Sequence, residues 1–163
     1  MTSVQFYFLF PSLFMLHELE EIIWMPSFVK KLSAQFPDIR FLSYYTPFTF
    51  NAIVLEQFLM LLLSLFLSYQ FSNYTIYATI VIAYIYHIFG HLIQTVVIRK
   101  YVPGLLTGIL TSLFALCNLK NEFPIKLYGY SLFTFLVIIL NLVVSFMILN
   151  KISHKNSTQT IIS

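Results

Sequence analysis

The chain has 163 residues, of which 59% are hydrophobic and only 9% are charged, and its formal net charge is +3. Soluble domains carry about 25% charged residues, so this composition excludes an ordinary soluble domain. The few basic residues form no cluster with interleaved aromatic residues, which argues against a nucleic-acid partner. A single cysteine excludes a disulfide framework within the chain.

The first hydrophobic segment runs from about residue 5 to Trp24 and is expected to end before Pro26. It has the length of a signal-peptide core, but no Lys or Arg precedes it and no small-residue cleavage site follows it. We therefore expect it to remain in the protein as a membrane span. Its second half, FMLHELEEIIWM (residues 14–25), holds the densest charge cluster of the chain.

Four further segments follow, separated by turn residues. Because water is absent from the hydrocarbon core, spanning segments of about 20 apolar residues must be helical. The sequence predicts an all-α, polytopic membrane helix bundle of about five transmembrane helices, forming one domain over residues 1–150 with a polar tail at 151–163. The second segment starts at Thr46-Pro47, where Thr can cap and Pro suits the first helical position. The expected segments are 47–69, 75–98, 104–119 and 127–150.

The basic residues between the segments predict the orientation. An N-terminus outside the cell places seven of the nine Lys and Arg residues on the cytoplasmic side, as the positive-inside rule prefers. We therefore expect an N-out, C-in topology. The richness in Ile, Phe, Tyr, Asn and Lys is compatible with an AT-rich bacterial genome, and the expected location is a bacterial cell membrane. The seven residues are Lys30, Lys31, Arg40, Arg99, Lys100, Lys151 and Lys155.

The segment 27–46 is too polar to span a membrane. Its apolar residues Phe28, Leu32, Phe36 and Ile39 recur at helical spacing, which predicts a helix lying along the cytoplasmic interface. An unstructured basic loop is the alternative, equally plausible before Pro37 and favoured after it.

Ionisable residues inside the expected spans are the main functional signal. Charges at the middle of a membrane helix cost roughly 2.5–3.5 kcal/mol, so such residues normally serve a function and face a partner. Four of the six acidic residues and three of the four histidines lie in these spans. They are His17, Glu18, Glu20, Glu21, Glu56, His87 and His91.

Helical spacing sorts these residues by face. His17, Glu20 and Glu21 stand at i, i+3 and i+4 and share a face, whereas Glu18 points about 100° away. His87 and His91 also share a face, with Gly90 between them leaving room for a neighbour. With the orientation above, the three helices present these side chains and Glu56 at overlapping depth, within ~16 Å of the cytoplasmic ends.

A bound divalent metal would offset the desolvation of several such groups at once. Imidazole with carboxylate suits zinc, iron or manganese, with zinc or iron expected here. Two ions with a bridging carboxylate, or one ion held by the three histidines with Glu residues around it, both fit. A frayed helix end and a metal-free proton relay are the alternatives. The candidate metal ligands are His17, Glu20, Glu21, Glu56, His87 and His91.

These motifs resemble the HXXEE-motif family of integral membrane proteins of unknown function. The naming motif corresponds to His17-Glu18-Leu19-Glu20-Glu21, and the resemblance extends over residues 13–110. The family pattern also includes Asn-x4-Glu, HxxxH and Pro-Gly. They are matched by Asn51 to Glu56, His87 to His91 and Pro103-Gly104. The resemblance supports the site without naming a reaction.

The leading hypothesis is an intramembrane metalloenzyme that acts on a lipid or another hydrophobic small molecule at the cytoplasmic side. Glu20 or Glu21 is the expected catalytic base for hydrolysis or acyl transfer with zinc, and iron would suit oxidative chemistry. A metalloprotease is disfavoured because Glu stands where H-E-x-x-H has its second His. The alternatives are a small metal-ion or proton transporter and a structural membrane subunit.

Overall fold

The computed structural model describes residues 2–39, 42, 45–119 and 125–160, in which the long elements are all α-helices. The expectation of an all-helical chain with five long segments is confirmed within these residues. Arg40 and Lys120, which bear on the orientation, lie outside them. The helices are α1 (Ser3–Gln35), α3 (Pro47–Gln70), α4 (Thr75–Ile98), α5 (Leu105–Asn118) and α6 (Ile125–Thr160).

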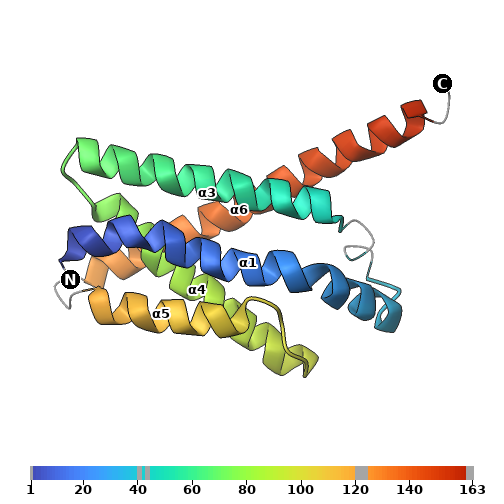
Figure 1. Ribbon diagram of the computed structural model, residues 1–163, viewed down its shortest axis with the longest axis horizontal. Helices are drawn as coiled ribbons and strands as arrows, with labels where there is room; N and C mark the ends of the chain where they lie inside the picture. Colours follow the sequence, from blue (N-terminus) through green and yellow to red (C-terminus); the bar gives the residue numbers. More distant parts are fainter. Residues whose placement is uncertain (1, 40–41, 43–44, 120–124, 161–163) are drawn as a thin grey trace.

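The helices pack into a bundle around α1 and α4 (Figure 1). Helix α1 packs against α3 and α5, and α4 packs against α3, α5 and α6. Aromatic rings fill much of the shared core: Phe10 meets both Tyr77 and Tyr84 edge-on, the latter at 5.3 Å between ring centroids. Such contacts fix how α1 is turned relative to α4, and this rotation decides which of their polar residues meet.

Helix α1 is longer than the sequence predicted. It begins with a capping box of Thr2 and Gln5 and continues through Pro26, so the boundary expected there is wrong. Proline removes one backbone hydrogen bond but leaves the helix continuous here, and Phe28 and Leu32 extend the same apolar pattern. The helix ends at Gln35 because Phe36 precedes Pro37 and leaves the α region (φ −129°, ψ 71°).

The segment 27–46 is therefore helical up to Gln35, as a continuation of α1. Its place along the cytoplasmic interface stays a prediction. The last segment also extends further than expected, because α6 continues past Asn150 to Thr160. Both extensions carry polar sequence beyond an apolar stretch, where helical hydrogen bonding can continue into a wet environment.

Much of the outer surface is apolar. Three helices of the described residues are long and apolar enough to cross a membrane: Pro47–Gln70, Thr75–Ile98 and Ile125–Lys151. Along α6, Phe133 and Leu140 are 69% and 64% exposed. Apolar exposure on this scale is compatible with a membrane protein. Helix α5 is apolar but shorter than these three helices. Helix α1, which carries the charged HXXEE residues, is not among the helices that are both long and apolar enough to cross a membrane.

Candidate metal centre

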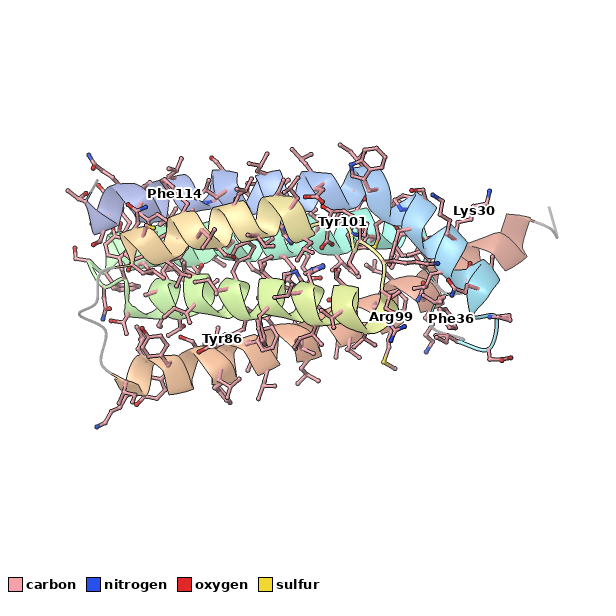
Figure 2. The ribbon with its side chains drawn as sticks, turned by 90° about the horizontal axis from the view of Figure 1, so that it is seen from below. Lys30, Phe36, Tyr86, Arg99, Tyr101 and Phe114 are labelled. Atoms are coloured by element: carbon pink, nitrogen blue, oxygen red, sulfur yellow. The ribbon has the colours of Figure 1, made fainter. Side chains whose placement is uncertain are left out.

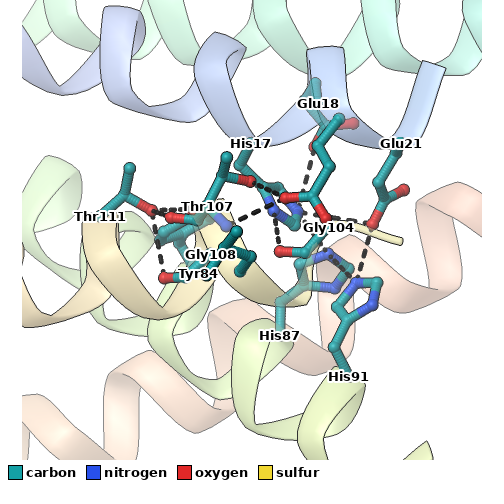
Figure 3. A network of polar contacts seen from close by, with 12 residues as sticks. His17, Glu18, Glu21, Tyr84, His87, His91, Gly104, Thr107, Gly108 and Thr111 are labelled. Carbon is teal, nitrogen blue, oxygen red and sulfur yellow. Dashed lines mark hydrogen bonds and ion pairs between the residues drawn. The ribbon is translucent and has the colours of Figure 1, made fainter. Parts of the chain in front are cut away.

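His17 is fully buried on α1, and its ring is oriented by two neighbours. Its Nδ1 lies 2.9 Å from the carbonyl oxygen of Gly104, which can only accept a hydrogen bond, so Nδ1 donates. The ring of Tyr84 meets it edge-on, at 5.4 Å between centroids. In the neutral ring, the Nε2 lone pair is then free and directed away from Gly104 (Figure 3).

His87 and His91 of α4 bring two more imidazoles to the same point. The Nε2 atoms of His17 and His87 are 3.4 Å apart, and those of His87 and His91 are 3.0 Å apart. Each Nε2 carries either one proton or one lone pair, so three facing nitrogens cannot all pair with one another. A single cation would accept a lone pair from each of them.

Glu21 completes the group with a carboxylate that is only 6% exposed. Its Oε1 lies 2.9 Å from Nε2 of His91 and 3.5 Å from Nε2 of His17. Nδ1 of His91 is buried and has no hydrogen-bond partner among the described residues. We refer to His17, Glu21, His87 and His91 as the His/Glu group.

The spacing within the His/Glu group would allow its four members to bind one ion. Its members each offer one ligand atom, and these atoms lie within 4.8 Å of one another. Zinc–nitrogen bonds of 2.0–2.1 Å in a tetrahedral site imply separations between ligands of about 3.3–3.4 Å. Four of the six separations between these atoms run from 2.9 to 3.5 Å, and the other two are within 4.8 Å. Three imidazoles with one carboxylate also form a donor set suited to zinc or iron.

Gly104 makes this approach possible. It has a positive φ of 87° and precedes α5, and a Cβ there would lie 2.6 Å from Oε1 of Glu21 and 2.7 Å from Cε1 of His17. A Cβ on Gly108 would lie 2.6 Å from Ile88 and 3.2 Å from Nδ1 of His17. The two glycines therefore let α5 pack against His17. Gly90 behaves differently, since no atom of the residues that the structure describes lies within 4 Å of its Cβ position, and none of them occupies the expected space.

A family model described as "Protein of unknown function with HXXEE motif" matches residues 8–119. The chain belongs to this HXXEE family. The family match spans α1, α3, α4 and α5, and so includes each member of the His/Glu group.

A relative from Bacillus subtilis (strain 168), described as uncharacterized protein YrkK, is 35% identical over 103 residues. The match covers 60% of this chain and 61% of that protein. No solved structure matches the chain.

Glu20 of the HXXEE motif lies outside the His/Glu group. Its Oε2 accepts hydrogen bonds from the backbone N–H of Thr107, at 2.9 Å, and from the hydroxyl of that residue, and Tyr101 donates to Oε1. Thr107 lies in the first turn of α5, whose preceding Gly104 has no side chain to cap it. Glu20 therefore satisfies an orphan N–H and places a negative charge at the positive end of α5. Burial and the hydrogen bond to Glu20 raise the pKa of the Tyr101 phenol.

Glu56 also lies outside the group, although the sequence placed it at the same depth. Its Oε1 accepts a hydrogen bond of 3.0 Å from the side-chain amide of Asn141 on α6. Asn51, which the family resemblance pairs with Glu56, is exposed near the start of α3. The structure thus brings together four of the six candidate ligands and gives Glu20 and Glu56 other partners.

Glu18 was not among the predicted site residues. It is 7% exposed, and its Oε1 lies 4.0 Å from Nε2 of His17. The helical angle from His17 suggested a different face, but the angle describes the Cα positions and not the reach of a long side chain. Tyr84 and Gly104, which contact His17, were also not predicted as site residues. The sequence did contain a signal for Glu18: a carboxylate in an apolar span has no solvent to face, so it is expected to face a polar partner inside the bundle.

Proposed function

We propose that this HXXEE-family protein is an integral membrane protein with one divalent metal ion held by His17, Glu21, His87 and His91. The observation that carries the proposal is the convergence of three imidazole Nε2 atoms and one carboxylate oxygen at coordination distances inside a buried site. The fixed tautomer of His17 supports it, because metal-bound histidines commonly donate their other N–H to a carbonyl. A group of four ligands favours one ion over two.

We further propose that the protein is embedded by about five spans, N-out and C-in, in a bacterial cell membrane. The three long apolar helices support the embedding, and the distribution of Lys and Arg supports the orientation. This orientation places the His/Glu group toward the cytoplasmic side, where a lipid or another hydrophobic molecule could reach it.

The metal centre would serve an enzyme acting on such a substrate. A zinc ion would supply Lewis acidity for hydrolysis or acyl transfer, and an iron ion would supply oxidative chemistry. Glu21 would hold the ion, and we assign the proton-accepting role to Glu18, because its carboxylate lies 4.0 Å from Nε2 of His17 without belonging to the His/Glu group. Glu20 is the weaker candidate for this role, because three donors already occupy its oxygens.

Metal analysis of the purified protein tests the centre. We expect the wild type in detergent to retain close to one equivalent of zinc or iron, and Glu21→Ala and His87→Ala to lose at least ten-fold in metal affinity. Glu56→Gln is the matched control, since it alters an intramembrane carboxylate outside the group. A wild-type protein that binds no metal under several metal supplies would end the proposal.

The activity requires a separate comparison. Cells that overproduce the wild type should show changed lipid composition, and cells that overproduce Glu18→Gln should not. An unchanged lipid composition together with changed cellular metal content would favour metal transport by the same ligands.

A further inference from the structure

A groove of about 640 Å³ lies beside the His/Glu group, on the other side of the turn that leads into α5. One wall is a single face of α1 that starts at Glu20, and the other is formed by residues 100–107. Pro103 lines this groove, whereas the adjoining Gly104 contacts His17 and Glu21. The groove is therefore a compartment separate from the buried ligands. We call it the basic groove.

The basic groove has one basic end. Lys31 lines it from α1, and Lys100 donates a hydrogen bond to Gln35, which is one turn beyond Lys31 on the same helix face. Both lysines are exposed, and neither has a carboxylate partner among the described residues. Figure 2 shows this end of the molecule, where Lys30, Arg99 and Tyr101 also lie. A ligand there would meet two uncompensated positive charges.

The rest of the basic groove is apolar. Trp24, Phe28 and Leu32 line it from α1, and Leu106 faces them from α5. Glu20 stands at the far end, eleven residues and about 16 Å from Lys31 along the helix. The hydrogen bonds to Thr107 and Tyr101 occupy its carboxylate, so this end adds little repulsion.

We propose that the basic groove binds a phospholipid with an anionic headgroup. The headgroup would lie between Lys31 and Lys100, and one acyl chain would run along Trp24 and Phe28 toward Leu106. The positive charges of the lysines would select an anionic headgroup. In the proposed orientation, the basic end of the groove faces the cytoplasm and its apolar part faces the membrane interior, as the headgroup and acyl chains of a cytoplasmic-leaflet lipid do. This inference rests on the membrane embedding proposed above but not on the metal.

Native mass spectrometry in detergent tests the proposal by titration with phosphatidylglycerol and phosphatidylcholine. We expect the wild type to prefer phosphatidylglycerol, and the double variant Lys31→Gln/Lys100→Gln to bind it about 10–30-fold more weakly. The control Lys30→Gln/Arg99→Gln removes two neighbouring charges that do not line the groove, and should keep most of the affinity. Equal affinity for the two lipids, or equal losses in both double variants, would overturn the proposal.

Leu106→Trp tests the apolar end independently, because it fills the groove without changing charge. We expect Leu106→Trp to bind phosphatidylglycerol more weakly than the wild type does. In the wild type, glycerol 1-phosphate, which lacks acyl chains, should not displace the bound lipid. Retention of wild-type affinity in Leu106→Trp would refute the placement of the acyl chain. Metal content should be unchanged in all these variants, so failure of lipid binding is distinguishable from failure of the metal centre.

Discussion

Two polar sites inside this apolar bundle show that a buried carboxylate beside another polar side chain is not enough to form a candidate metal centre. Between α3 and α6, the carboxylate of Glu56 accepts a hydrogen bond from one side-chain amide, that of Asn141. In the His/Glu group, three imidazole nitrogens and a carboxylate oxygen face one another. The first site pairs one acceptor with one donor, whereas the second brings together four side chains that could each offer one ligand atom to a cation. The two sites therefore differ in the donor set that they offer to a metal ion.

Among the tests of this difference, removal of the proposed metal ion should change protein stability most. A ligand present at 1,000 times its Kd stabilises the folded state by about 4 kcal/mol, so chelation should lower the thermal unfolding midpoint of the wild type markedly. The unfolding midpoint of Glu21→Ala should not respond to chelator, because it lacks a ligand. A wild-type midpoint that chelator leaves unchanged would place the two polar sites in the same class.

Gly104→Ala should have the next largest effect. The positive φ costs a non-glycine residue roughly 1–2 kcal/mol. Overpacking against Glu21 and His17 adds about 1–3 kcal/mol. We expect a lower unfolding midpoint and weaker metal binding. Gly90→Ala is the matched control, since its Cβ meets open space within a helix, and it should be neutral or stabilising by about 0.5–1 kcal/mol. Equal effects of the two substitutions would show that Gly104 does not shape the site.

Much of this arrangement could be predicted from the sequence. Hydropathy and turn residues located the five helices, and i, i+4 spacing paired His17 with Glu21 and His87 with His91. The depth of Glu56 was an insufficient guide, because spacing along a helix gives relative angles within it and not its rotation against its neighbours. Side-chain packing, such as Phe10 against Tyr77 and Tyr84, sets that rotation.

The contacts of α5 with α1 also could not be predicted from the sequence. Gly104 and Gly108 are four residues apart in the sequence, but only the fold shows that they pack against His17. Glu20 and Glu21 are adjacent in the chain and both suited to metal, yet Glu20 contacts Thr107 and Tyr101, whereas Glu21 lies beside His17 and His91. The structure separates them because α5 needs a cap at its start and Glu20 is within reach of Thr107.

Glu20→Gln tests whether the two adjacent glutamates of the motif have different roles. The amide retains an oxygen for the N–H of Thr107 but loses the charge that favours the N-terminus of α5. We expect a loss of about 0.5–1 kcal/mol in stability, measured by thermal unfolding in detergent, and unchanged metal content. Loss of metal in Glu20→Gln, with a normal unfolding midpoint, would restore Glu20 to the ligand set.

Glu56→Gln should have the smallest effect, because glutamine keeps an oxygen that can accept the hydrogen bond from Asn141. A neutral amide is also easier to desolvate between apolar helices than a carboxylate. We expect a change in stability within about 0.5 kcal/mol, as for substitutions that preserve their partners. Metal content should remain that of the wild type, measured by elemental analysis of the purified protein. Depletion of metal in this variant would mean that Glu56 leaves Asn141 to join the ion, and the two polar sites would then be one.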